Sequence, residues 1–376
     1  MSRWLDTTTV KELLHSLLHA ELSAYRGAQV SLAPNGLQID SLERLYLAAS
    51  VNEFFNLHET GVEDRLLMTE SLEAWAELIV EAMPYTSGLS FRTSGSSGVP
   101  KTCHQPWLAI ETEARALHRR LHDKVSATRV VSWLPLHHLY GFMLGIAYPL
   151  VNGLPRLAAG DTLPALHSGD VIVTVPPRWG YLASSRKSWP SDVVGVTSTG
   201  PLPQHAAQLL TANGLPNLLE IYGSSETGGV ATRWFPAASF ELLEHWQRSS
   251  CDAISAVHCG ERVGLPDHIA WQDTRRFTLQ GRRDDLVTIG GTNVSPLEVA
   301  GKIEALPEVS HCAVRAYIAG DDQVRLKAYI VPSASEEDAS AGLDAMLPSL
   351  PAAQRPVSIT FGHALPTNAL GKLCDW

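Results

Sequence analysis

The sequence has few cysteines, and their placement excludes two common ways of stabilising a fold. Five cysteines occur among 376 residues, at positions 103, 251, 259, 312 and 374, and no two of them form a Cys-x-x-Cys pair. This odd, scattered set argues against a disulfide framework and against a structural zinc site. We therefore expect hydrophobic cores to hold the fold, and a chain of this length can build one large and one smaller domain.

Long apolar runs and an excess of basic residues are also missing. No stretch of about 18 apolar residues occurs, and residues 1–6 lack the charged segment and apolar run of a secretory signal. We therefore expect no membrane span and a cytoplasmic location. The 29 basic residues are outnumbered by 39 acidic ones, which leaves a net charge of −10. Because nucleic-acid surfaces need a basic excess, we expect no nucleic-acid partner.

One stretch is dense in features that bind phosphate, namely Thr93-Ser94-Gly95-Ser96-Ser97-Gly98-Val99-Pro100-Lys101. Gly95 and Gly98 permit backbone conformations closed to other residues, so N–H groups and hydroxyls can surround an anion, and Lys101 adds a positive charge. The stretch is not a Walker A loop, because Pro100 stands where that pattern needs its second glycine. From composition alone, a Ser/Gly-rich surface loop stays open as an alternative.

Apolar runs alternate with helical patterns after this loop. Strands are predicted at residues 130–134, 170–175, 193–197 and 218–222, and helices at residues 110–121 and 204–212. Such alternation predicts an α/β fold, with a large N-terminal domain of mostly parallel sheets flanked by helices. Ligands of these sheets bind at the carboxyl ends of the strands. Residues 7–22 repeat apolar side chains at three- and four-residue intervals, which predicts an amphipathic helix before this domain's sheet.

The phosphate loop and four further segments, in the right order, resemble the adenylate-forming superfamily. This superfamily includes acyl-CoA and aryl-CoA synthetases, nonribosomal adenylation domains and luciferases. The resemblance covers roughly residues 85–376 and implies ATP and Mg²⁺ as cofactors. It identifies the nucleotide-phosphate loop as Thr93, Ser94, Gly95, Ser96, Ser97, Gly98 and Lys101. The part before the loop is shorter than in relatives and looks replaced by short helices.

The second matching segment is Pro135-Leu136-His137-His138-Leu139-Tyr140-Gly141. It is similar to the superfamily's Pro-x-x-His-x-x-Gly motif, with His138 in the histidine position that borders the acyl pocket in relatives. Taken alone, a histidine pair after a strand is also compatible with a purely structural role. The resemblance implies a site role for His138 and none for His137.

Two segments after predicted strands resemble nucleotide-binding turns. Ser198-Thr199-Gly200-Pro201-Leu202 resembles the Gly-Gly-Ala-Pro-Leu turn beside the adenine, and departs from it by having Ser198 and Thr199 before Gly200. The stretch from Tyr222 to Gly229, Tyr-Gly-Ser-Ser-Glu-Thr-Gly-Gly, is similar to the Tyr-Gly-x-Thr-Glu signature.

The Tyr222–Gly229 segment carries the predicted metal ligand. The resemblance implies that Tyr222 stacks near the adenine, that Ser225 contacts a phosphate and that Glu226 holds Mg²⁺. Gly223 and Ser224 complete this turn. Because Mg²⁺ prefers oxygen donors and keeps water ligands, one carboxylate plus the nucleotide phosphates is a sensible ligand set. A glycine-rich turn with an incidental glutamate is the structural alternative.

A later segment, Gly281-Arg282-Arg283-Asp284-Asp285, resembles the superfamily's hinge motif, which implies that Arg282 contacts the ribose and that Asp284 is the hinge. Asp267 lies fourteen residues before Gly281, the usual spacing of the aspartate that binds the ribose hydroxyls, although the usual Thr-Gly before it is missing. A carboxylate that binds a vicinal diol needs only its two acceptor oxygens. We therefore expect a nucleotide- and acid-binding domain at residues 1–283 and a mobile domain at 284–376.

The C-terminal region has the pattern of a small α+β module. Helices are predicted at residues 298–306 and 341–347, strands at 311–316, 324–331 and near 359, and a solvated loop at 333–340. Leu365-Pro366-Thr367-Asn368-Ala369-Leu370-Gly371-Lys372-Leu373 is similar to the superfamily's Pro-x-Thr-x-x-Gly-Lys loop. The resemblance implies that Lys372 is the catalytic lysine, although a lysine here is also compatible with a solvated tail.

Together these segments imply an ATP-dependent acid–thiol ligase. The implied catalytic residues are Lys372, Glu226, His138 and Arg282. The enzyme would adenylate a small carboxylic acid and transfer the acyl group to a pantetheine thiol of an acyl carrier protein or CoA, because no cysteine of the chain is a candidate acceptor. The short segment before the phosphate loop offers little surface for the adenosine part of CoA, which favours the carrier protein.

The acid itself is only loosely indicated. Trp133, Tyr140 and Phe142 lie close in sequence to His138, and no aspartate is placed to bind an α-amino group. This favours an aromatic acid, such as a hydroxybenzoate, over an amino acid. A fatty or β-hydroxy acid ligase is the first alternative. A degenerate ATP-binding protein without ligase activity is the second.

Overall fold

The computed structural model describes residues 4–28, 30, 39–69, 71–92, 101–160, 163–282, 287–289, 292–319, 323–368 and 373–376. The chain forms two compact units, one of residues 1–247 and 256–261, the other of residues 248–255 and 262–376. The domain boundary predicted between residues 283 and 284 falls outside the described residues and stays a prediction. None of the helices in the described ranges has the length and hydrophobicity that a membrane crossing requires.

The first unit is built on a mostly parallel sheet. Its strands are β3 (Arg129–Ser132), β4 (Arg156–Ala158), β5 (Asp170–Thr174), β6 (Val194–Thr197), β7 (Asn217–Ser224), β8 (Gly228–Trp234) and β9 (Phe240–Leu242). They lie in the order β9-β8-β7-β6-β5-β3-β4. The neighbours from β4 to β7 run parallel, whereas β8 is antiparallel to both β7 and β9. Strand β5 is buried along its whole length, as expected for a parallel strand covered on both faces.

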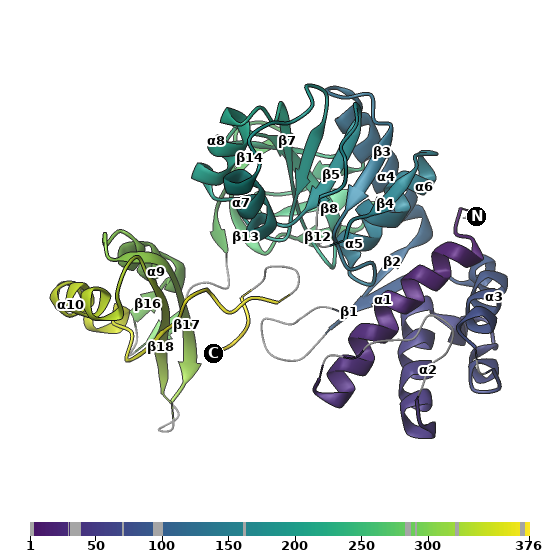
Figure 1. The fold of residues 1–376 in the computed structure, drawn as a ribbon, viewed down its shortest axis with the longest axis horizontal. Coiled ribbons are helices and arrows are strands. Elements are labelled where there is room, and N and C mark those ends of the chain that lie inside the picture. Colours follow the sequence, from purple (N-terminus) through teal and green to yellow (C-terminus); the bar gives the residue numbers. More distant parts are fainter. Residues whose placement is uncertain are drawn as a thin grey trace. The chain divides into compact units, whose positions relative to one another are not determined.

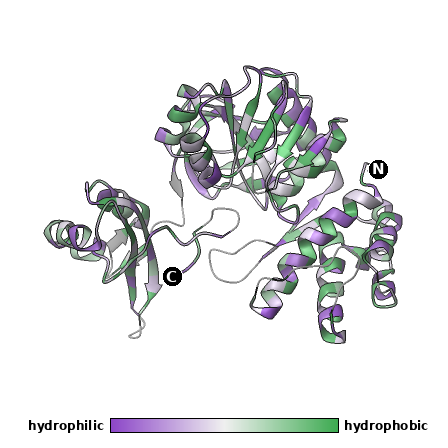
Figure 2. Cartoon of the chain, in the orientation of Figure 1, coloured by the Kyte–Doolittle hydropathy of each residue, from purple (hydrophilic) through white to green (hydrophobic). Residues whose placement is uncertain are grey.

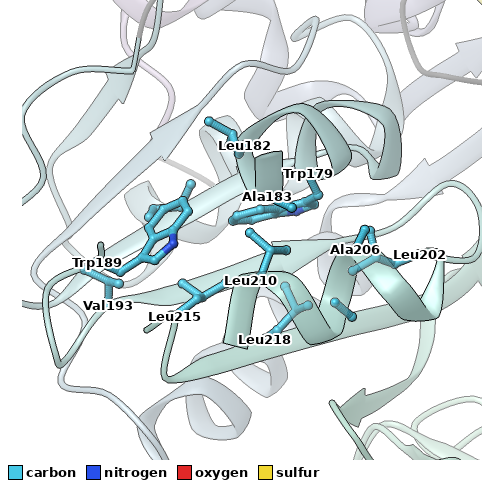
Figure 3. Packing of buried hydrophobic residues seen from close by; sticks show 12 residues of the cluster. Trp179, Leu182, Ala183, Trp189, Val193, Leu202, Ala206, Leu210, Leu215 and Leu218 are labelled. Carbon is cyan, nitrogen blue, oxygen red and sulfur yellow. The ribbon is translucent and has the colours of Figure 1, made fainter. Parts of the chain in front are cut away.

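Helices cover both faces of this sheet. They are α4 (Trp107–His122), α5 (Leu139–Phe142), the π-helix η4 (Met143–Ala147), α6 (Tyr148–Val151), α7 (Pro176–Ser185) and α8 (Gln204–Ala212). Figure 1 shows α7 and α8 on one side of the strands and α4 and α6 on the other. On the α7–α8 side, Trp179 and Leu210 pack with Leu218 of β7 in a buried cluster (Figure 3). The predicted α/β class is therefore confirmed.

The helices α1 (Thr7–Arg26), α2 (Ser41–Phe55) and α3 (Leu72–Ala82) precede the sheet in the chain. The predicted N-terminal helix is confirmed. Asp6 caps α1 by accepting a hydrogen bond from the Thr9 N–H at 2.8 Å, and Gly27 ends it in the left-handed conformation. Its buried residues recur at three- and four-residue intervals, so hydrophilic and hydrophobic colours alternate along it in Figure 2.

An antiparallel pair, β1 (Gly88–Arg92) and β2 (Thr102–Pro106), follows these helices in the chain. Short strands β10 (Trp246–Arg248), β11 (Ala253–Ala256) and β12 (Arg262–Gly264) come after β9. In the sequence, strands β1 and β2 flank residues 93–101, the predicted phosphate loop.

The second unit is the predicted α+β module, extended by preceding strands. Its elements are β13 (Asp267–Trp271), β14 (Arg276–Arg282), β15 (Val287–Ile289), β16 (Thr292–Val294), α9 (Pro296–Glu304), β17 (Val309–Ile318), β18 (Val324–Pro332), α10 (Glu336–Met346) and β19 (Ser358–Phe361). Strand β18 pairs antiparallel with β17 and parallel with β19. Residues Val299 and Ile303 of α9 and Leu343 of α10 pack on this sheet in one core.

The prediction of a solvated loop at residues 333–340 is wrong for most of this range, because α10 begins at Glu336. Ser335 caps the helix by accepting a hydrogen bond from the Asp338 N–H at 3.1 Å. Glu336, Glu337 and Asp338 occupy the first turn, where negative charges interact favourably with the helix dipole. The acidic composition that suggested a loop is therefore that of a helix N-terminus.

Candidate active site

The loops after β6 and β7 bring two of the predicted nucleotide-binding segments together. Ser198, Thr199 and Gly200 follow directly on the last residue of β6. Because β6 and β7 are parallel, their carboxyl ends lie at the same edge of the sheet. The Ser198 hydroxyl donates a hydrogen bond to the carbonyl oxygen of Ile221 at 2.8 Å, next to Tyr222. The two turns are thus joined through a bond that no local motif indicates.

Thr199 has an unusual backbone conformation. Its φ is 77°, in the left-handed region, where a β-branched residue is strained by about 1–3 kcal/mol. The superfamily motif has glycine at this position. The loop therefore has a backbone shape that suits glycine although the residue is threonine.

The turn from Tyr222 to Gly229 is held by its own polar groups. The Ser224 N–H donates to the Thr227 hydroxyl oxygen at 3.1 Å, and that hydroxyl donates to the Gly228 carbonyl at 2.9 Å. The Tyr222 ring is half-buried, with its centroid 5.8 Å from that of Phe240. Glu226 is exposed at the tip of the turn. Its carboxylate is thus accessible to a cation.

Glu226 and Lys101 both influence the Cys103 thiol. Burial raises the pKa of the Cys103 thiol, the nearby Glu226 carboxylate raises this pKa further, and the Lys101 ammonium lowers it. Both charges are therefore near enough to this thiol to influence its pKa. Residues 93–98, the rest of the predicted phosphate loop, lie outside the described residues, so their role stays a prediction.

The two ends of the phosphate-loop segment are joined through one carboxylate. Arg92 and Thr102 are directly opposite in the β1–β2 register. The Arg92 Nε donates to Glu53 Oε2 at 3.0 Å, and the Thr102 hydroxyl donates to Glu53 Oε1 at 2.6 Å. Glu53 belongs to α2 and was missed by the sequence analysis, because nothing in its local sequence links it to residues 92–102.

The two neighbouring histidines have different surroundings. His138 precedes α5 as its N-cap residue, and its carbonyl accepts the Phe142 N–H at 2.7 Å. His137 Nδ1 lies 2.8 Å from the Ser16 hydroxyl, which also accepts the Leu136 N–H at 3.0 Å. His137 therefore ties helix α1 to this segment, a structural contact.

Replacing His137 by asparagine, whose amide can still bond Ser16, should flatten the pH dependence of stability between pH 6.5 and about 4. Burial lowers the pKa of His137 from 6.5 to about 4. Stability from the neutral ring is complete above pH 6.5 and is lost as the pH falls through 4, because the unfolded state binds the proton first. The full effect is about 3 kcal/mol.

Urea unfolding at neutral and mildly acidic pH, followed by tryptophan fluorescence, measures this difference. His245 serves as an internal reference, because burial lowers its pKa to about 4 as well and both proteins retain it. Parallel stability curves for the parent and the asparagine variant would contradict the prediction.

The aromatic residues near His138 do not all support a pocket. Phe142 is fully buried and packs against Phe91 and Trp4, with centroids 5.5 and 6.2 Å away. Phe142 therefore belongs to the core and does not support the expectation of an aromatic acid. Tyr140 is half-buried and donates to the Thr174 carbonyl at 3.2 Å. Trp133, also half-buried, follows directly on the end of β3.

The second unit holds the remaining described candidates. Asp267 and Arg282 are directly opposite in the β13–β14 register, and Asp267 is buried. The structure thus brings together two residues fifteen positions apart that the sequence assigned to the same ribose. Lys372 lies outside the described residues, but Thr367 and Leu373 on either side of it form a β-bridge.

Comparison with known proteins decides the family. Residues 90–261 match the model of the family described as AMP-binding enzyme. A 4-coumarate--CoA ligase from Halorhodospira halophila is 40% identical over 98% of this chain and 99% of its own length. The chain belongs to the AMP-binding enzyme family. Its membership of the adenylate-forming superfamily and its class, acid–thiol ligase, are thereby confirmed.

A second relative agrees with this assignment to the AMP-binding enzymes, and a solved structure shares the fold. A 4-coumarate--CoA ligase from Rhodobacter capsulatus is 36% identical over 98% of this chain and 100% of its own length. The crystal structure of ATP-bound MatB from Rhodopseudomonas palustris matches with a TM-score of 0.62 and 16% identity, covering 97% of this chain and 91% of that one. The likeness to MatB shows the fold alone.

Proposed function

We propose that this AMP-binding enzyme activates an aromatic carboxylic acid of the hydroxycinnamate type with ATP and Mg²⁺ and transfers the acyl group to CoA. The observation that carries the proposal is the pair of full-length relatives at 40% and 36% identity, both named 4-coumarate--CoA ligase. At this identity over whole chains, the family's activity and its broad substrate class are expected to be shared. The ligase names count against a degenerate ATP-binding protein.

The relatives change the preferred thiol acceptor from an acyl carrier protein to CoA. The short segment before the phosphate loop favoured a carrier protein, on the argument that little surface is left for the adenosine part of CoA. Both relatives are named CoA ligases, and they share that short segment, because their whole lengths align with this chain. CoA is therefore the better-supported acceptor, and the carrier protein becomes an outcome of the test.

An aromatic acid also agrees with the described residues of the first unit. Half-buried Trp133 and Tyr140 lie at the carboxyl ends of β3 and β5, where parallel sheets bind ligands. The Trp133 indole N–H donates to the Gly160 carbonyl at 2.7 Å, which fixes the ring orientation. A fixed indole and a phenol ring offer flat apolar contacts for an aromatic acid.

In the first half-reaction, a carboxylate oxygen of the acid attacks the α-phosphorus of ATP. The bond from this phosphorus to the oxygen that bridges it to the β-phosphorus breaks, and pyrophosphate leaves. We propose that Lys101 and the phosphate-loop hydroxyls bind the phosphates, that Tyr222 contacts the adenine, and that Asp267 accepts hydrogen bonds from the ribose hydroxyls. These contacts lower the barrier mainly by aligning the reactants and by balancing charge.

The donor set around Glu226 fits Mg²⁺. Within the described ranges no group of three or more His, Cys, Asp or Glu residues is placed to hold a metal by itself. A single exposed carboxylate suits Mg²⁺ best, because this ion retains waters and takes its other ligands from substrate phosphates. When bound, Mg²⁺ would neutralise phosphate charge. Glu226 would hold it, beside the Ser225 hydroxyl.

In the second half-reaction, the thiol sulfur attacks the acyl carbon of the adenylate. The bond from this carbon to the phosphate oxygen breaks, AMP leaves, and the thiol proton passes to solvent. We propose that His138, the N-cap residue of α5, borders the acid during both steps, as the resemblance implies.

The proposal is tested by measuring pyrophosphate release with 4-coumarate, 4-hydroxybenzoate, a medium-chain fatty acid and an amino acid. We expect kcat/KM for 4-coumarate to exceed the others by about tenfold or more, since pocket contacts of this size discriminate to that degree. Mass spectrometry should find the acyl group on CoA and not on a phosphopantetheinylated carrier protein. Equal rates with the fatty acid, or acyl transfer to the carrier alone, would contradict the proposal.

A further inference from the structure

Two buried polar side chains lie directly beneath the Tyr222–Gly229 turn. The side-chain amide of Gln105 contacts the turn, since its Nε2 donates to the Ser225 carbonyl at 2.7 Å and to the Glu226 carbonyl at 3.4 Å. Glu113 accepts a hydrogen bond from the Gly229 N–H. Both side chains are at least nine-tenths buried, with 6% and 7% of their residue surfaces exposed. The turn is therefore attached to the protein interior at its tip and at its Gly229 end.

Glu113 occupies a position where an apolar residue is expected. It lies on the buried face of α4, three residues after Ile110 and four before Leu117. Burial raises the pKa of this carboxyl to about 7, while the bond from Gly229 opposes the rise. A carboxyl at such a place destabilises the fold relative to a leucine of similar volume. An ionisable residue kept there points to a role other than packing.

The two glycines at the end of the turn, Gly228 and Gly229, leave the space that the Glu113 carboxyl occupies. Gly228 has a φ of 67°, which favours glycine, and a Cβ built on it would collide with Glu113 Oε2. A Cβ on Gly229 would lie 2.7 Å from Glu113 Oε1, closer than real Cβ contacts. The Trp246 indole N–H donates to the Gly229 carbonyl at 2.9 Å, on the other side of this residue. The turn thus passes through a slot that only glycine can fill while Glu113 is present.

The geometry assigns Gln105 and Glu113, on the basis of the proposed function, as positioning residues that hold the Ser225–Glu226 tip for Mg²⁺ and phosphate. Gln105 belongs to β2 and Glu113 to α4, the two elements that follow the phosphate-loop segment. The same short stretch of chain therefore connects the phosphate loop to the metal-binding turn. We infer that these bonds fix the position of the Glu226 carboxylate relative to the Lys101 ammonium.

The test measures how MgATP binding, followed by calorimetry, and pyrophosphate release depend on Mg²⁺ concentration in three variants. Glu113→Ala removes the bond to Gly229, and Gln105→Met removes the two amide bonds while keeping the side-chain volume. We expect each to raise the half-saturating Mg²⁺ concentration about tenfold, the loss typical of residues that orient metal ligands. Glu113→Gln keeps an acceptor for the Gly229 N–H, so its half-saturating Mg²⁺ concentration should lie close to that of the parent. Thioester formation from supplied acyl-adenylate should change less than about twofold.

A matched control separates positioning from general destabilisation. Asp170→Asn alters another fully buried carboxyl of the first unit, which pairs with Arg129 at the amino end of β5. It should lower the melting temperature without changing the Mg²⁺ requirement. The assignment would be overturned if the half-saturating Mg²⁺ concentration rose equally in Asp170→Asn, or if it stayed unchanged in Gln105→Met. Absence of pyrophosphate release by the parent enzyme with every acid would instead refute the proposed function.

Discussion

Replacing Lys372 by alanine should lower the rate of adenylation by about 10²–10³-fold, while thioester formation from supplied acyl-adenylate stays within about twofold of the parent. The resemblance implies that this lysine is catalytic, and we propose that it balances the negative charge that develops when the carboxylate attacks the α-phosphate. Loss of a single group that stabilises such charge typically costs about 3–4 kcal/mol. The second half-reaction releases AMP and does not require that group.

The two half-reactions are measured separately, by pyrophosphate release and by acyl-CoA formation from the isolated adenylate. Lys302→Ala is the matched control, because Lys302 is a lysine of the same unit whose described contacts are with Glu298 and Gln354. It should leave both half-reactions unchanged. Equal losses in both half-reactions for Lys372→Ala, in a folded protein, would show that the lysine has no specific role in adenylation.

Replacing Glu226 by glutamine should weaken Mg²⁺-dependent ATP binding by more than about 100-fold. The change keeps the size of the side chain and removes the only charge that the proposed site directs at the metal. Even residues that merely orient metal ligands contribute about 10–100-fold to affinity, so loss of the ligand itself is expected to exceed that range. Calorimetry with ATP, in the presence and absence of Mg²⁺, measures the effect.

Glu244→Gln provides the comparison for Glu226. Glu244 is also an exposed glutamate of the first unit, and it pairs with Arg119 at 2.7 Å. Its replacement should leave the affinity for MgATP unchanged. If Glu226→Gln bound MgATP as tightly as the parent, the metal-binding role of the Tyr222–Gly229 turn would be wrong, and with it the reason for the Gln105 and Glu113 contacts.

Much of the fold was predictable because the determining signals are local. The helix predicted at residues 204–212 is α8 with the same bounds, and the strands predicted around β3, β5, β6 and β7 are present. Apolar periodicity and turn residues act over a few positions, so a linear pattern is enough to locate these elements. The acidic run after Ser335 was misread, since the same residues suit a solvated loop and the first turn of a helix.

The sequence by itself determined the enzyme class, acid–thiol ligase, because the phosphate loop, the Tyr222–Gly229 turn and the Lys372 loop are short segments whose residue types and spacing resemble the superfamily's motifs. Only the tertiary structure decided which other residues support them. Gln105 meets Ser225 across 120 positions of the chain, and Phe142 proved to be core because Trp4 and Phe91 pack against it. Contacts at such separations depend on how strands pair and helices cover a sheet, and no local pattern records that arrangement.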